Sequence, residues 1–199
     1  MRHKDSVKRG LWVVFAVVVV LAFVVNGVFA QAKKAQTRQI EIVRLQDIDN
    51  PDAGFKVDLW ADKKDATYKV GDGIVFSFKS NKDCRMTLFN VATSGKVQIL
   101  FPNEHQKDNL VKAGATYQIP PKDAKYFFKA QGPAGEDVVK AIATLDKVAL
   151  VNPSDCKPAG TFQEVTKPEA QTAKDIEIAL KPLDTKKWAE AEKILKIVE

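Results

Sequence analysis

The 199-residue sequence has few of the residues that build metal centres and nucleophilic sites, with two cysteines and two histidines. A structural zinc site needs four Cys or His ligands, and a cysteine nucleophile needs a histidine base beside it. After the first 30 residues the only histidine is His105, and its neighbours in the sequence are polar or charged. The sequence therefore predicts no metal site, no cofactor and no Cys-His catalytic pair.

Motifs of nucleotide-dependent and serine enzymes are also missing. Gly95-Lys96 lacks the upstream glycine and the following hydroxyl residue of a phosphate-binding loop. Ser154 and Lys157 have a Ser-x-x-Lys spacing, but prolines flank them and neither Ser-Asp-Asn nor Lys-Thr-Gly follows. We therefore assign no catalytic residue from the sequence.

No continuous run of one charge sign occurs, although the net charge is +6. Lysines are interspersed with acids, as in the stretch Asp62-Lys63-Lys64-Asp65. Nucleic-acid binding is typical of basic residues gathered on one face, whereas mixed charges usually form a solvated surface. The sequence predicts no nucleic-acid partner.

Only one long uncharged apolar run is present, Leu11–Val25, and it follows a basic start. A break at Asn26-Gly27 and the small residue Ala30 before Gln31 are typical of a signal peptide, residues 1–30, cleaved after Ala30. The alternative is an uncleaved anchor, because about twenty residues can span a bilayer core of roughly 30 Å. We expect an exported protein that is periplasmic or secreted, or else anchored in the inner membrane with its domain outside the cytoplasm.

The rest of the chain is predicted to be a polar tether, residues 31–39, followed by a β-domain over residues 40–181. Large apolar side chains alternate with polar ones in Phe55–Leu59, Ile74–Phe78 and Val97–Phe101, which is the pattern of half-buried strands. Thr93–Lys96 is predicted to be a hairpin turn. Short strands separated by turns favour an all-β fold, and we expect an immunoglobulin-like antiparallel β-sandwich, with a small barrel as the alternative.

Two different patterns end the sequence. Asp175–Leu180 alternates and predicts a last strand. In residues 182–199, Asp184 can cap a helix, and apolar residues then recur at helical spacing. These residues are Trp188, Ala191, Leu195 and Val198. We expect a short C-terminal amphipathic helix that docks on the sheet or binds a partner or a membrane surface.

Cys84 and Cys156 are the only two cysteines. In an oxidising compartment they are expected to pair, and the disulfide would close a loop of about 70 residues, worth roughly 4 to 5 kcal/mol. The alternative is two separate buried thiols.

Several short motifs follow one another between Lys56 and Thr144. They include Tyr68-x-x-Gly71-Asp72, Leu88-Phe89-Asn90-Val91, Leu100-Phe101-Pro102-Asn103 and Gly132-Pro133-x-Gly135-Glu136. Together they resemble the bacterial domain-of-unknown-function family 4384, over about residues 56–144. Members of that family are typically exported or envelope-associated, so the resemblance implies a non-catalytic β-domain with no established ligand. It also favours a strand for Val138–Leu145, whose apolar spacing fits either a strand or a helix.

Loops at the ends of a sheet are common recognition sites on a rigid β-scaffold. Together with the resemblance, this predicts a non-catalytic binding or adaptor module of the cell envelope. It would recognise an envelope protein or a cell-wall polysaccharide through sheet-end loops or the C-terminal helix, and it would meet the membrane only through residues 11–30 if these are uncleaved. The candidate binding residues are Phe101, Pro102, Asn103, His105, Gly132, Pro133 and Trp188. The alternative is an envelope hydrolase that uses clustered carboxylates from among Glu104, Asp108, Glu136 and Asp137.

Overall fold

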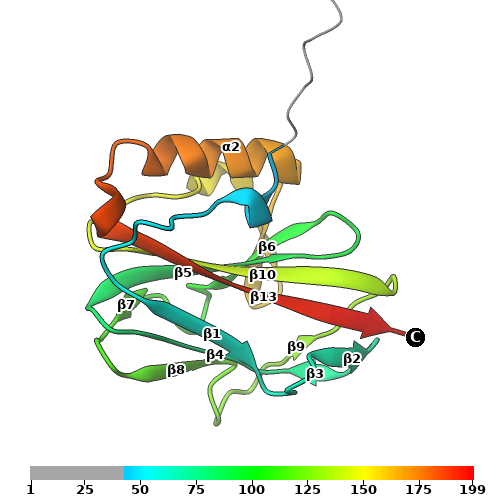
Figure 1. Cartoon of the computed structure of the whole chain (residues 1–199). Helices are drawn as coiled ribbons and strands as arrows, with labels where there is room; N and C mark the ends of the chain where they lie inside the picture. Colours follow the sequence, from blue (N-terminus) through cyan, green and yellow to red (C-terminus); the bar gives the residue numbers. More distant parts are fainter. Residues whose placement is uncertain (1–42) are drawn as a thin grey trace, which may run out of the picture. The chain divides into compact units, whose positions relative to one another are not determined.

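The computed structural model describes residues 43–199, which are mostly β-strand in several sheets, with one α-helix (Figure 1). A three-stranded antiparallel sheet has the order β1-β4-β8. Its strands are β1 (Val57–Ala61), β4 (Phe76–Ser80) and β8 (Thr116–Ile119). Two shorter strands, β3 (Gly73–Ile74) and β9 (Phe128–Lys129), form an antiparallel ribbon.

The large sheet has eight strands, in the order β11-β12-β6-β5-β10-β13-β2, with β7 also paired to β5. The strands are β2 (Thr67–Lys69), β5 (Cys84–Val91), β6 (Val97–Phe101), β7 (Leu110–Val111), β10 (Gly135–Thr144), β11 (Cys156–Ala159), β12 (Phe162–Val165) and β13 (Trp188–Val198). Every pair in the described sheets is antiparallel except β13 with β2, which run parallel. The predicted all-β class with antiparallel sheets is therefore confirmed.

The segments with period-two alternation are strands. In β4, Phe76 and Phe78 are completely buried on one side of the sheet. β5 and β6 pair as a hairpin around the predicted turn, where Gly95 has a φ of 80°. A left-handed backbone of this kind costs glycine little, which explains why a turn forms there. The strand favoured for Val138–Leu145 is also confirmed, because β10 covers all of it except its last residue.

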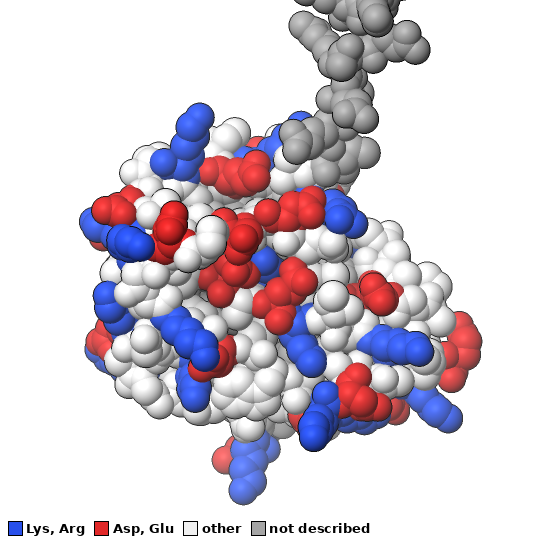
Figure 2. Space-filling model, viewed as in Figure 1, with Lys and Arg blue, Asp and Glu red and all other residues white. Residues whose placement is uncertain are grey.

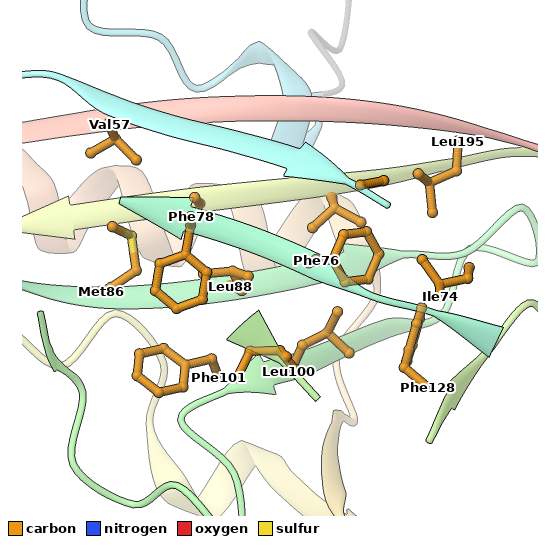
Figure 3. Packing of buried hydrophobic residues seen from close by; sticks show 14 of the residues in the cluster. Val57, Ile74, Phe76, Phe78, Met86, Leu88, Leu100, Phe101, Phe128 and Leu195 are labelled. Atoms are coloured by element: carbon orange, nitrogen blue, oxygen red, sulfur yellow. The ribbon is translucent and has the colours of Figure 1, made fainter. Parts of the chain in front are cut away.

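The two sheets face each other across a cluster of buried apolar side chains, which we call the aromatic core (Figure 3). The Phe78 ring of β4 lies 5.3 Å from the Phe101 ring of β6, measured between centroids. Phe76 lies 5.4 Å from Phe128 of β9. Tilted aromatic pairs at these distances add to the stabilisation from burial, so this cluster joins the two sheets.

The opposite face of the large sheet is covered by α2 (Glu169–Leu180) and the 3-10 turn η1 (Leu45–Asp47), which lie above the sheet in Figure 1. We call the buried side chains beneath them the aliphatic core; Phe89 is its only aromatic ring among the fully buried described residues. The backbone N–H of Leu45 donates to Glu169 Oε1 at 3.1 Å, which holds η1 against the first turn of α2.

The strand predicted for Asp175–Leu180 is wrong, because these residues belong to α2. The buried residues of α2 are Thr172, Ala173, Ile176 and Leu180, which lie on one face of a helix. A strand would bury Ile178 together with Ile176, yet Ile178 is 67% exposed. Six alternating residues are too few to distinguish the two-residue period of a strand from the period of a helix.

The amphipathic helix predicted for residues 182–199 is also wrong. The chain ends in β13, and the ten residues Trp188–Ile197 pair with ten residues of β10. Ala189, Leu195 and Ile197 are at most 2% exposed and face the aromatic core. The predicted cap at Asp184 does accept a hydrogen bond, from the N–H of Lys186, but it begins only the 3-10 turn η3 (Thr185–Lys187). Pairing along a long neighbouring strand outweighs a weak helical spacing.

A buried ion pair joins β10 to β13 on the α2 side of the large sheet. Lys140 is 3% exposed, and its Nζ lies 2.6 Å from Glu190 Oε2 and 3.6 Å from Glu192 Oε2. Figure 2 shows acidic side chains gathered across the middle of the viewed face. A buried ammonium group is tolerated only with partners, so Lys140 fixes both glutamates along β13.

Cys84 and Cys156 are free thiols, in place of the predicted disulfide. Cys84 is 1% exposed on β5 and belongs to the aromatic core, whereas Cys156 packs against the aliphatic core. The large sheet separates these two clusters, so the alternative of two separate thiols describes the structure.

The predictions for residues 1–30, including cleavage between Ala30 and Gln31, and for the tether 31–39 lie outside the described residues. Within residues 43–199, no helix is long and apolar enough to cross a membrane. Val43–Glu199 form one compact unit, so the last eighteen residues are part of the domain and not a separate segment.

Candidate functional site

A hollow of about 710 Å³ opens on the large sheet, beside the end of β6. Its floor is apolar and includes Phe89, Ile99, Leu150 and Phe162. Polar side chains stand around the floor: Thr87, Asn103, Glu104, Lys107, Asn109, Thr161 and Gln163. An apolar floor with a few polar groups around it, in a cavity of roughly 300 to 1,000 Å³, is typical of ligand sites.

One wall of the hollow is the loop after β6, residues 102–109, and Asn103 holds this loop in place. Asn103 is 4% exposed, and its Nδ2 donates to the carbonyl oxygen of Leu100 at 2.9 Å and to Tyr126 Oη at 3.2 Å. Its Oδ1 accepts from the N–H groups of His105 at 3.0 Å and Gln106 at 2.9 Å. A buried amide with all these partners fixes the loop backbone.

Tyr126 supports the same loop from outside the hollow. Its hydroxyl donates to Gln106 Oε1 at 3.1 Å, and its ring stacks on the His105 imidazole at a centroid distance of 4.8 Å. Burial raises the pKa of the Tyr126 hydroxyl, with a smaller opposing effect from the Asn103 hydrogen bond. The hydroxyl therefore stays protonated and keeps donating at physiological pH.

The opposite wall is the β11–β12 hairpin together with residues 148–153. The hairpin turns at Gly160, which has a φ of 64°. The N–H of Glu104 donates to the carbonyl oxygen of Thr161 at 3.2 Å, which links the two walls. β12 also pairs with β6, so both walls are attached to the same strand.

Residues 67–147 match the model of a protein family described as a domain of unknown function, DUF4384. This part of the chain is therefore similar to DUF4384. The match begins with β2 and ends just after β10, which confirms the resemblance found in the sequence, although it starts later than residue 56. No curated protein and no solved structure matches the chain.

The hollow lies where the DUF4384 match meets the residues that follow it. Its floor on β5 and β6 and its loop wall belong to the match, whereas residues 148–163 come after it. No strand or helix was predicted from the sequence within residues 148–163, so this second wall was missed. Gly160 was the one local signal of a tight turn there.

Of the seven predicted binding residues, three lie at the hollow or on its loop wall, and four do not. Pro102 and Asn103 line the hollow, and His105 is exposed on the same loop. Phe101 is 2% exposed and packs in the aromatic core, so it cannot contact a partner. The floor of the hollow is provided by other apolar residues, among them Phe89 and Ile99.

Gly132 and Pro133 are exposed, but they lie toward the other end of β6. The loop that contains them leads into β10 beside the β5–β6 turn, where Asp137 Oδ1 accepts from Thr93 N–H at 2.8 Å. The loop after β6 leaves from the opposite end of the same strand. The structure therefore does not join the two predicted loops into one surface.

Trp188, the last predicted binding residue, is half-buried at the start of β13. It lines a second, smaller hollow of about 460 Å³ between η1, the end of α2 and η3. Asp47, Asp49 and Glu177 also line it. Trp188 is thus remote from the loop after β6.

The carboxylates of the hydrolase alternative are not gathered in one place. Glu104 lines the large hollow, and Asp108 accepts from the N–H of Leu110 in the same loop. Asp137 is 2% exposed and bound to Thr93, next to Glu136 at the opposite end of β6. Glycoside hydrolysis needs two carboxyl groups within about 10 Å of each other across one cleft.

Cys156 is the one thiol that lines the large hollow among the described residues. Burial, and then the charge of Asp155, raise the pKa of the Cys156 thiol above its ordinary value of 9.0. A thiol is nucleophilic only as the thiolate, so Cys156 is largely unreactive at neutral pH. Its position nevertheless makes it a useful probe of the hollow.

Proposed function

We propose that this protein is a non-catalytic binding module of the bacterial cell envelope, which holds an envelope protein or a cell-wall polysaccharide in the hollow beside β6. The observation that carries the proposal is the hollow itself, with its apolar floor, polar rim and fixed loop wall. Export rests on the basic and apolar pattern of residues 1–30.

The composition of the hollow supports binding of an extended partner that is partly polar. The apolar floor favours contact with the carbon skeleton of a sugar or with an aliphatic side chain, since burial of apolar surface is favourable. Asn109 and Gln163 can donate and accept hydrogen bonds at the rim, while Lys107 and Glu104 bring charges of opposite sign. A preformed wall reduces the entropy that binding would otherwise lose.

We further propose that the domain is a variant of the immunoglobulin-like sandwich. Two sheets face each other across the aromatic core, and most neighbouring strands are antiparallel, which supports this assignment. α2 on the outer face and the parallel β13–β2 pair would be additions to that arrangement.

The test is capture of partners by residues 31–199 from solubilised cell envelopes, together with co-sedimentation with purified cell-wall polysaccharide. Ala149 is exposed in the wall of the hollow, so Ala149→Trp should fill it and reduce capture by about tenfold or more. Ala115→Trp, at an exposed turn that does not line the hollow, is the matched control and should capture as the wild type does.

Equal capture by both tryptophan variants and the wild type would contradict binding in the hollow. Release of soluble fragments from the polysaccharide would favour the hydrolase alternative instead. Both variants should unfold at the wild-type temperature, because each replaces an exposed alanine.

A further inference from the structure

The connection from β8 to β9 presents a row of side chains to solvent. Tyr126, Phe128 and Ala130 are at most 9% exposed and point into the domain. The residues that alternate with them are exposed: Lys125, Phe127, Lys129 and Gln131. Alternation of this kind follows from an extended backbone, so Lys125, Phe127 and Lys129 project from the same side.

Phe127 is 72% exposed, the largest exposed fraction among the large hydrophobic residues of the described part of the chain. It belongs to neither buried cluster, although its neighbour Phe128 packs in the aromatic core. A phenyl ring carries no hydrogen-bonding group, so no hydrogen bond to water offsets the cost of its exposure. The rigid attachment of its neighbours keeps the ring outside the domain.

Lysines flank this ring along the chain. Lys122, Lys125 and Lys129 are exposed, and none of them forms an ion pair within residues 43–199, in contrast to Lys112, which precedes them in the sequence. Asp123 is the single acid of this stretch. Figure 2 shows lysine side chains at the lowest point of the view, where Figure 1 places the connection between β8 and β9.

We propose that the row Lys125-Phe127-Lys129 is a contact surface for an anionic lipid bilayer. The ring enters the headgroup region, and the lysines on either side contact lipid phosphates. A lysine near an anionic membrane surface is attracted to it, and apolar side chains add the free energy of their burial in the interface. None of these three residues lines the hollow beside β6, so the surface leaves that hollow free for its partner.

A lipid surface fits this row better than a protein or a glycan. A stable protein interface buries about 800 Å² on each partner, with a well-packed apolar centre, whereas this row offers one ring. Glycan sites use hydrogen-bonding side chains to read hydroxyl groups, and the row has only ammonium groups beside the ring. A single projecting ring between two cations suits shallow insertion among anionic headgroups.

The test is co-sedimentation of residues 31–199 with lipid vesicles at moderate salt. This fragment lacks the apolar run Leu11–Val25 and retains Val43–Glu199, which contain both buried clusters. One set of vesicles is phosphatidylcholine alone, and the other contains about one third phosphatidylglycerol. The protein should pellet with the anionic set and be released by high salt.

Phe127→Ser should weaken binding to the anionic vesicles by about tenfold, and Lys125→Ser with Lys129→Ser by at least as much. Ile178→Ser is the matched control, because Ile178 is 67% exposed on α2, in a different part of the domain. It should bind as the wild type does. All variants should retain the wild-type unfolding temperature.

Equal binding to both kinds of vesicle, or no binding to either, would overturn the proposal. So would wild-type affinity of Phe127→Ser, or an equal loss in Ile178→Ser. Because the hollow is tested by capture with Ala149→Trp, failure of one proposal is distinguishable from failure of the other.

Discussion

The two faces of the large sheet are closed in different ways. The face toward β1, β4 and β8 is filled by aromatic rings that pack against one another. The face toward α2 is covered by one helix of twelve residues, by η1 and by irregular segments. One short helix cannot cover an eight-stranded sheet, so the hollow lies at the uncovered end of β6. The first face stabilises the domain, and the second provides a surface for recognition.

The largest loss of stability is expected from a substitution in the aromatic core. Phe78→Ala should lower the free energy of unfolding by about 3 to 5 kcal/mol, because Phe78 is completely buried between the sheets. Phe127→Ala, which removes an exposed ring between β8 and β9, should change it by less than about 0.5 kcal/mol. Urea unfolding measures both values. Equal losses of unfolding free energy in the two variants would show that the aromatic core is not closely packed.

Substitutions on α2 test the packing of the aliphatic core. Ile176→Ala should cost about 2 to 4 kcal/mol, since Ile176 is completely buried, whereas Ile178→Ala should cost less than about 0.5 kcal/mol. Urea unfolding of the two variants also decides between helix and strand. A strand over Asp175–Leu180 would make both substitutions costly.

The ion pair of Lys140 sharpens the comparison, because it buries an ammonium group on the α2 face of the large sheet. Glu190→Gln should lower the free energy of unfolding by about 1 to 2 kcal/mol, since Lys140 then keeps only the longer contact to Glu192. The double variant Lys140→Met with Glu190→Gln should lose less than the single variant. A larger loss in the double variant would show that the ion pair is a net source of stability.

The smallest effect concerns the two thiols, one on each face. Cys156 is accessible from the hollow and should react with maleimide in the folded protein, whereas Cys84 should react only after unfolding. A raised pKa leaves less thiolate at any pH below it, so the Cys156 rate should still be rising at pH 9, the ordinary value. Mass spectrometry of the labelled protein gives both rates. Failure to label either cysteine, even after unfolding, would support the predicted disulfide instead.

The strands that enclose the aromatic core were largely predictable from the sequence, whereas the helix that covers the aliphatic core was not. Alternation marked β4 and β6 and placed Phe76 and Phe78 inside, because period two is a local property of an extended chain. Ile176, Ile178 and Leu180 alternate too, but Pro168 precedes them by eight residues and the buried stripe starts at Thr172. Only packing on the sheet decides that this segment is a helix.

The site was predictable in part for the same reason. Pro102 and Asn103 end a recognisable strand, so a loop beside the sheet could be expected there. Trp188 has helical spacing to Ala191, and only the long partner strand β10 makes this segment a strand. The wall from residue 148 to Phe162 depends on the pairing of β12 with β6, a contact between residues 64 to 68 positions apart.

The most direct test of the hollow as a binding site is to block it from within. Residues 31–199 would be labelled with a bulky maleimide at Cys156 in the folded state, and capture of envelope proteins and polysaccharide would be compared before and after labelling. Cys156→Ser, treated identically, controls for other effects of the reagent. The account predicts loss of capture on labelling in the wild type and no loss in Cys156→Ser. Undiminished capture by the fully labelled protein would contradict it.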